Sequence, residues 1–184
     1  GKAAWSVPLK APAWESPGVD ADRVFAGSAD GTLAAFQGAT GNVEWQVALG
    51  APVNTSVRRR TNDLIVGPAD GLVHRVSARD GRRLASLALD LTLRPVSAPV
   101  LTADSALVLL ADEGADYRVL VAVDLALTGI KWRREAADKW STSRVFATSS
   151  IVVLGTPHGE VEAFCASTGS PAWSHKLTNV PIPV

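Results

Sequence analysis

The chain has 184 residues with 18 basic and 18 acidic side chains, and its formal net charge at pH 7 is zero. This balance gives no bulk electrostatic attraction to nucleic acid or to an anionic membrane surface. Hydrophobic residues make up 47% of the chain. The longest apolar runs are nevertheless only as long as a strand, well short of the roughly 20 residues that a membrane-spanning helix needs. The composition therefore predicts an ordinary soluble globular chain without a transmembrane segment.

The cysteine and methionine content excludes few classes of protein. Cys165 is the only cysteine, so no intrachain disulfide can form. Cysteine usage therefore does not indicate whether the protein lies in an oxidising or a reducing compartment. Methionine is absent, and no basic segment followed by an apolar one precedes the first expected strand. We expect the chain to be a processed product or a segment of a longer protein.

The stretch 24–49 reads as strand, turn, strand, turn, strand. Asp30 and Gly31 form the residue pair that tolerates positive φ in a two-residue hairpin. Gly41 can take a left-handed conformation in the second turn, and Trp45 lies in the third strand. This stretch is the best-preserved copy of a unit that recurs along the chain.

The unit repeats about every 40 residues, a period that is typical of propellers and solenoids. Trp5 and Trp45 are 40 residues apart, the next step of 40 leads to Ala85, and spacings of 47 and 41 residues then lead to Trp132 and Trp173. The longer spacing contains an enlarged acidic hairpin at 112–116, and a loop tolerates such an insertion.

Each unit also has an earlier strand, expected at 51–57, 96–101 and 143–147, which makes four strands per repeat. We expect one propeller segment over 1–184. Its full repeats are predicted at 10–49, 50–89, 93–136 and 140–177, with partial repeats at 1–9 and 178–184.

Short strands at regular spacing indicate an all-β fold, and four strands in a period near 40 favour a β-propeller over a sandwich or barrel. The predicted fold is four complete four-stranded blades that form a fragment, or half, of a seven- or eight-bladed ring. An isolated arc of blades leaves two blade faces uncovered. We therefore expect it to close with a second copy of itself or with the missing half of a longer protein.

The unit VFAGSADGTLAAFQGATGNVEW resembles the PQQ-like β-propeller repeat, in which a hairpin is followed by the pattern A-x-T-G-x-x-x-W. The resemblance covers nearly the whole chain. It implies that the turn glycine and the tryptophan four residues later dock adjacent blades, with the indole over the same or a neighbouring turn. The docking residues implied in this way are Gly1, Trp5, Gly41, Trp45, Gly81, Gly129, Trp132, Gly169 and Trp173.

The chain departs from the family pattern at two places. Ala85 stands where the second full repeat should have its tryptophan. The aspartate that often precedes the turn remains only as Asp124, with Gln37, Ser77 and Cys165 at the other positions.

Catalytic members of the family are quinoprotein dehydrogenases. The resemblance implies that such enzymes hold a quinone on the propeller axis together with a Ca²⁺ ion, that an aspartate acts as base, and that many also contain a vicinal disulfide. With one cysteine and four asparagines in or beside predicted turns, the chain lacks these motifs. We therefore predict no catalytic residue, no cofactor and no metal.

Non-catalytic relatives include a propeller lipoprotein of the outer-membrane β-barrel assembly machinery and extracytoplasmic domains of signalling proteins. By resemblance alone, we expect a non-enzymatic scaffold that binds protein partners in the bacterial envelope, in the periplasm or otherwise outside the cytoplasm. A sensor or ligand-binding domain of a larger signalling protein and a fragment of a quinoprotein dehydrogenase are the alternatives.

Other candidate sites have simpler interpretations. His74, His158 and His175 lack the paired spacing of metal ligands. The acidic hairpin at 112–116 could hold Ca²⁺, but it lacks alternating ligands, and a solvated hairpin tip explains it. Cys165 and His175 could pair as nucleophile and base, but a buried strand cysteine is the simpler interpretation.

One basic concentration remains. Arg58, Arg59 and Arg60 are expected to form a loop that either binds an acidic partner or a phospholipid headgroup, or is simply solvated. Three more arginines lie in the next predicted turn of the same unit, at Arg79, Arg82 and Arg83. The sequence does not decide whether the two groups share a face.

Overall fold

The structure is a computed structural model that describes residues 2–112, 117–137, 145–156 and 159–176. All regular elements in these residues are strands, and no helix in them could span a membrane. The predictions for Gly1, residues 113–116, His158 and the partial repeat at 178–184 lie outside the described residues.

The described strands form four antiparallel sheets, which we number as blades 1 to 4. Each is a meander in chain order, except that β9 of the third sheet pairs with β11 beside β10. Blade 1 contains β1 (Gly18–Val19), β2 (Arg23–Gly27), β3 (Thr32–Gln37) and β4 (Val43–Ala48). Blade 2 contains β5 (Arg58–Arg60), β6 (Asp63–Val66), β7 (Leu72–Ser77) and β8 (Arg83–Ala88). Blade 3 contains β9 (Arg94–Pro95), β10 (Val100–Leu101), β11 (Ser105–Ala111), β12 (Tyr117–Asp124) and β13 (Ile130–Ala137). Blade 4 contains β14 (Val145–Ala147), β15 (Ile151–Gly155), β16 (Glu160–Cys165) and β17 (Pro171–Lys176).

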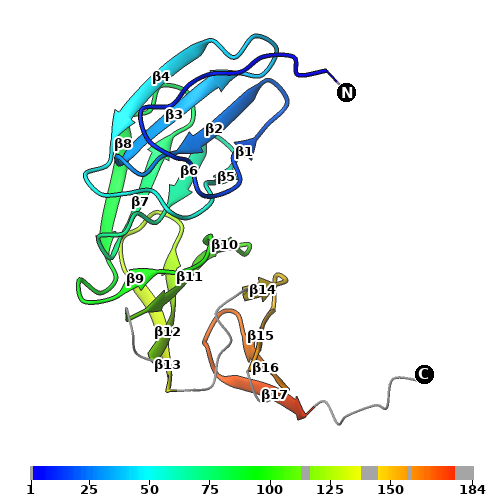
Figure 1. Ribbon diagram of the computed structural model, residues 1–184. Coiled ribbons are helices and arrows are strands. Elements are labelled where there is room, and N and C mark those ends of the chain that lie inside the picture. The colour runs from blue at the N-terminus through cyan, green and yellow to red at the C-terminus, as the bar shows by residue number, and fades with distance from the viewer. Residues whose placement is uncertain (1, 113–116, 138–144, 157–158, 177–184) are drawn as a thin grey trace.

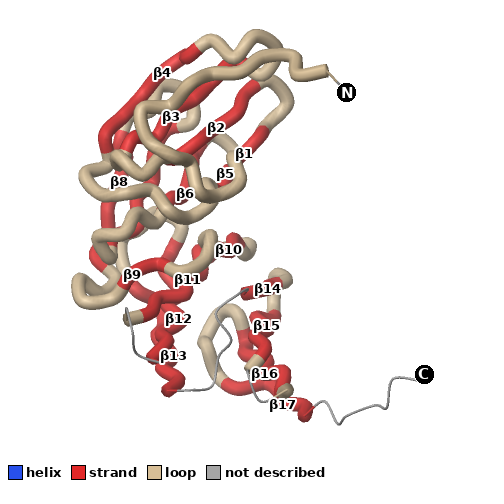
Figure 2. The backbone as a smooth tube through the Cα atoms, viewed as in Figure 1, coloured by secondary structure: helices blue, strands red, loops and turns tan. Residues whose placement is uncertain are grey.

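The blades follow one another along an arc (Figure 1). Strands β1, β5, β10 and β14 lie on its concave side and the last strands of the blades lie toward its convex side (Figure 2). Successive inner strands β1, β5, β10 and β14 contact one another. The all-β propeller architecture with four-stranded blades is therefore confirmed.

Two inner strands differ from the expectation. The segment 51–57 is a connection, not a strand, and the inner strand of blade 2 is β5. The backbone N–H of Val53 donates to the carbonyl of Ser28 at 3.0 Å, and the Val53 side chain is buried against Gly27. This segment therefore packs on the blade 1 hairpin. In blade 3 the inner strand is interrupted, since both β9 and β10 pair with β11.

The hydrophobic core lies between the blades, and both faces of the fully buried middle strand β11 contribute to it. In β11, Leu107 and Leu109 pack toward blade 4, whereas Ala106, Val108 and Leu110 pack toward blade 2. A third cluster joins blades 1 and 2 around Phe25, Leu33, Leu64 and Val66. The described residues thus form three blade junctions, each with its own buried cluster.

Candidate functional site: blade junctions and the axial hollow

Three indoles lie over a turn glycine of the blade that follows. A Cβ atom built on any of these glycines would lie 2.5 to 2.7 Å from an indole carbon, a distance that no side chain can adopt. The glycines also have φ values between +69° and +75°, where L side chains are strained. The pairs are Trp5 with Gly41, Trp45 with Gly81, and Trp132 with Gly169. We call each pair an indole seat.

Each seat also contains a hydrogen bond from the indole Nε1–H to a backbone carbonyl three residues before the glycine. The donor and acceptor pairs are Trp5 with Gly38 at 2.7 Å, Trp45 with Ala78 at 3.2 Å, and Trp132 with Ala166 at 2.9 Å. A buried indole N–H usually requires such a partner. The bond fixes the ring orientation, so the seat is a specific contact and not only an apolar one.

Two expected docking residues are not in seats. Nothing lies within 4 Å of a Cβ built on Gly129, and the positive φ in this turn falls on Leu127 at 60°. The turn is built differently because the Asp124 carboxylate accepts backbone N–H groups from Ala126, Thr128 and Gly129. The preceding blade also has no indole to contribute, since Ala85 replaces it.

Trp173 is the other exception. Its side chain is 49% exposed, whereas Trp132 is 8% exposed. No turn glycine in the described residues lies beneath it.

Sequence reasoning missed an arginine that reinforces one seat. Arg134 lies two residues after Trp132, donates from Nη1 to the carbonyl of Gly169 at 3.0 Å, and places its guanidinium 4.6 Å from the Phe164 ring centroid. An arginine over an aromatic face adds a cation–π attraction. The available signal was a basic residue on the same strand as the tryptophan.

Arg58, Arg59 and Arg60 form strand β5, not the loop that the sequence suggested. Arg59 pairs with Asp20 of blade 1 at 3.1 Å, and Arg58 donates from Nε to the carbonyl of Pro99 in blade 3 at 3.2 Å. Their heads therefore tie the inner strand of blade 2 to both neighbouring blades.

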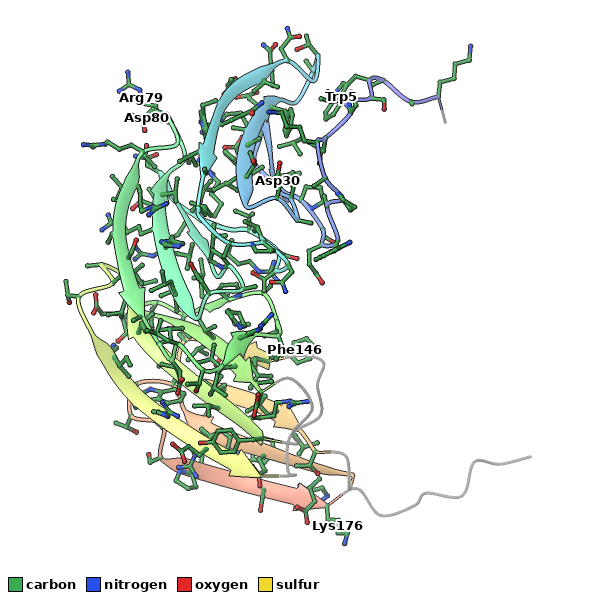
Figure 3. The ribbon with its side chains drawn as sticks, turned by 60° about the vertical axis from the view of Figure 1, so that its left-hand side comes forward. Trp5, Asp30, Arg79, Asp80, Phe146 and Lys176 are labelled. Carbon is green, nitrogen blue, oxygen red and sulfur yellow. The ribbon has the colours of Figure 1, made fainter. Side chains whose placement is uncertain are left out.

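The inner strands surround a hollow of about 840 Å³ on the concave side of the arc. Its polar lining includes Arg58, Arg59 and Glu15, and the Ser56 hydroxyl donates to the Glu15 carboxylate at 3.1 Å. Phe146 of β14 also lines it, is 64% exposed, and projects on the concave side (Figure 3). The hollow offers charged, hydroxyl and aromatic groups to a partner.

A family model described as outer membrane protein assembly factor BamB matches residues 1–126. The chain belongs to the BamB family. A search among curated protein sequences gives no match.

The structure resembles those of several solved propellers. BamB from Moraxella catarrhalis is 20% identical with a TM-score of 0.73, over 95% of this chain and 52% of that one. Quinohemoprotein alcohol dehydrogenase ADHIIG from Pseudomonas putida HK5 is 14% identical with a TM-score of 0.78, over 92% and 35% of the two chains. The computationally designed Ika4 protein is 19% identical with a TM-score of 0.73, over 90% and 98%. This BamB-family chain thus spans about half the length of the Moraxella protein, and the likeness at these identities shows the fold alone.

The nucleophile and base expected as an alternative in this BamB-family chain do not meet. His175 pairs across the sheet with Val161, four residues away from Cys165. The Cys165 thiol instead shares a hydrogen bond of 3.3 Å with the Ser167 hydroxyl, and the turn hydroxyls lower the pKa of the thiol to about 7. Cys165 occupies the turn position that Asp124 holds in blade 3, so its contacts support the turn. No group of three potential metal ligands occurs in the described residues.

His74 is a fully buried residue in blade 2. Its Nδ1 lies 2.7 Å from the Ser86 hydroxyl, while Nε2 has no hydrogen-bond partner among the described residues and lies 3.9 Å from the Asp70 carboxylate. Burial lowers the pKa of His74 and the Arg83 guanidinium lowers it further, against the opposing charge of Asp70. The imidazole is therefore neutral in the folded protein.

Acidification should weaken the fold through His74. The unfolded chain binds a proton near the ordinary pKa of 6.5 and the folded chain only at lower pH, so stability is fully present above about 6.5 and is lost as the pH falls below it. We expect the free energy of unfolding, measured by urea titration, to decrease with falling pH in this window. His74→Gln should flatten this slope, with His175→Gln as the exposed control. An unchanged slope in His74→Gln would contradict the assignment.

Proposed function

We propose that this BamB-family chain is a non-enzymatic β-propeller scaffold that binds protein partners in the bacterial cell envelope, in the assembly of outer-membrane proteins. The observation that carries the proposal is the match of residues 1–126 to the model of an outer-membrane protein assembly factor. The rigid indole seats support it, because a scaffold needs loops held in fixed relative positions.

The surface that best fits an acidic protein partner lies at the turn end of blade 2. The backbone N–H of Ala78 donates to the carbonyl of Asn62 at 2.8 Å, which brings the β5–β6 and β7–β8 turns together. A hollow of about 430 Å³ here is lined by Arg23, Arg79 and Arg82 among others. Arg23 is paired with Asp20.

Arg79 and Arg82 form no close ion pair within the described residues. The exposed Asp80 lies between them, and hydrogen bonds from the Ser77 side chain and the Arg82 backbone N–H, followed by the charges of Arg82 and Arg79, lower the pKa of its carboxyl. Arg79 and Arg82 would contact the partner's carboxylates in this hollow, whereas Arg58 and Arg59 line the axial hollow.

The test is a binding titration. The chain is immobilised, and the purified periplasmic domains of the outer-membrane assembly machinery from the same bacterium are passed over it. We expect saturable binding that becomes about tenfold weaker in the Arg79→Glu/Arg82→Glu variant and at higher salt, as removal of complementary charges predicts. Lys176→Glu is the matched control, because Lys176 lies at the opposite end of the arc from Arg79 (Figure 3). Absence of binding by the folded chain would contradict the proposal.

Dehydrogenase activity is the competing function, because the quinohemoprotein alcohol dehydrogenase has the same fold. The chain is mixed with pyrroloquinoline quinone and Ca²⁺, and dye-linked alcohol oxidation is followed. A scaffold should give no turnover above that of the free quinone. Measurable turnover would overturn the non-enzymatic part of the proposal.

A further inference from the structure

His74 lies on the face of blade 2 that packs against blade 1. It pairs across the sheet with Val66, and a cross-strand pair lies on one face of a sheet. Val66 belongs to the buried cluster that joins blades 1 and 2, whereas Val73, on the other face of β7, belongs to the cluster that joins blades 2 and 3. The fully buried imidazole is therefore part of the junction between blades 1 and 2.

The surroundings of the imidazole do not compensate a positive charge. The Asp70 carboxylate of the β6–β7 hairpin lies 3.9 Å from Nε2, which has no hydrogen-bond partner in the part of the chain that the structure describes. On β8, the Ser86 hydroxyl contacts Nδ1 and the Arg83 guanidinium is a like charge. Burial, and then Arg83, lower the pKa of His74 more than Asp70 raises it. The blade 1 side chains in the buried cluster of this junction carry no charge; they are Phe25, Leu33, Ala35, Leu49 and Val53.

Arg83 connects this site to the outer edge of the junction. Its Nη2 donates to the carbonyl of Ala48 at 3.0 Å and to that of Leu49 at 3.3 Å, where β4 of blade 1 ends. Strands β4 and β8 are the outer strands of the two blades (Figure 1). A positive charge on His74 would therefore repel the guanidinium that ties these two strands together.

The imidazole is also only one side chain away from solvent. Ser86, whose hydroxyl lies 2.7 Å from Nδ1, is exposed on β8. Separation of β4 from β8 would hydrate the ring without breaking the strand pairing within either blade. Hydration removes most of the cost of charging a buried group. A proton can thus be accommodated by opening this junction alone.

We propose that His74 is a proton-sensitive switch for the junction of blades 1 and 2, and that its protonation opens this junction at the outer strands β4 and β8. In the open state the imidazolium is hydrated, and Arg83 leaves the carbonyls of Ala48 and Leu49. The inner strands stay joined, because Arg59 of β5 pairs with Asp20 at 3.1 Å. The two blades therefore move apart about their inner edges.

The hollow of about 430 Å³ that we propose for the acidic partner spans the same junction. Arg23 of blade 1 lines it together with Arg79 and Arg82 of blade 2. Opening would move these two sides apart, so acidification would weaken binding of the partner. This consequence rests on the proposed function, whereas the opening itself is measured without a partner.

Trp45 provides the signal for the opening. Its indole lies on β4, over Gly81 of blade 2, and its Nε1–H donates to the carbonyl of Ala78 at 3.2 Å. Separation of the outer strands breaks this hydrogen bond between blades. The rate at which the Nε1 hydrogen exchanges with solvent therefore reports how often the junction opens.

Solvent exchange of the Trp45 indole, followed by NMR between pH 5 and 7.5, tests the proposal, with Trp45→Phe to assign the signal. The protection factor corrects for the effect of pH on the intrinsic exchange rate. We expect it to fall by about tenfold per pH unit below about 6, because the open molecule binds one proton that the closed molecule does not. His74→Gln should remove this dependence. His175→Gln is the matched control and should retain it, since His175 is exposed.

Urea separates opening of the junction from global unfolding. Local opening exposes little surface, so the Trp45 protection factor should stay nearly constant at urea concentrations below the unfolding transition. This measurement uses the unaltered chain and decides even where His74→Gln fails to fold. The proposal would be overturned by protection that is independent of pH, by a pH dependence that persists in His74→Gln, or by protection that follows global unfolding in urea. A pH-dependent opening that leaves partner binding unchanged would contradict only the proposed use of the hollow.

Discussion

Trp132→Ala should lower the free energy of unfolding by about 3 to 5 kcal/mol, the usual cost of removing a buried large aromatic side chain. Trp132 is 8% exposed and packs with Leu107, Ala122 and Phe164 at the junction of blades 3 and 4. Its removal opens a cavity and leaves the carbonyl of Ala166 without its donor. Urea unfolding followed by circular dichroism measures the change.

Two other tryptophans calibrate this result. Trp45→Ala should also lower the free energy of unfolding, but by less than Trp132→Ala. Trp45 is only partly buried, and its hydrogen bond to the carbonyl of Ala78 is longer, at 3.2 Å. Trp173→Ala should change the free energy of unfolding only by the small amount typical of a surface substitution, because Trp173 is 49% exposed. Equal losses in the free energy of unfolding for Trp132→Ala and Trp173→Ala would show that the indole seat adds nothing to stability.

The blade repeat could be predicted from the sequence because its signals are local. Hairpins need residues that tolerate positive φ, and Gly31 and Gly71 have φ values of 83° and 75°. Which turn each indole contacts could not be predicted. That contact joins residues 36 or 37 positions apart and depends on how one blade sits on the next.

The missed strand in blade 2 has a physical cause. Strand prediction rests on an apolar and polar alternation, and all three arginines of β5 are exposed, so they carry no such pattern. The segment 51–57 looked like a strand because Val53 and Val57 are apolar, but tertiary packing on blade 1 buries both. Here a long-range contact overrides local preference.

The unusual turn of blade 3 had a visible sequence signal. Gly129 precedes Trp132 by three residues, whereas Gly41 precedes Trp45 and Gly169 precedes Trp173 by four. The difference of one residue moves the left-handed conformation onto Leu127 and removes Gly129 from the seat position. The spacing therefore indicated that the turn at Gly129 differs from those at Gly41 and Gly169.

Gly169→Ala should destabilise the chain by about 2 to 4 kcal/mol, from the left-handed backbone and from overpacking against the indole together. Its φ is +69°, and the new Cβ would lie 2.6 Å from Cδ2 of Trp132. In the Trp132→Ala background only the backbone strain remains, so the same change should cost about 1 to 2 kcal/mol. The double-mutant cycle, measured by urea unfolding, isolates the contact between the two residues.

Two glycines serve as controls for this cycle. Gly129→Ala meets no atom within 4 Å and has no positive φ, so it should be nearly neutral. Gly50→Ala also meets no atom, but its φ is +103°, so it should show backbone strain alone. Strict additivity of Gly169→Ala and Trp132→Ala would mean that the glycine is required only by the turn. A positive coupling would establish that the missing Cβ is what admits the indole of the neighbouring blade.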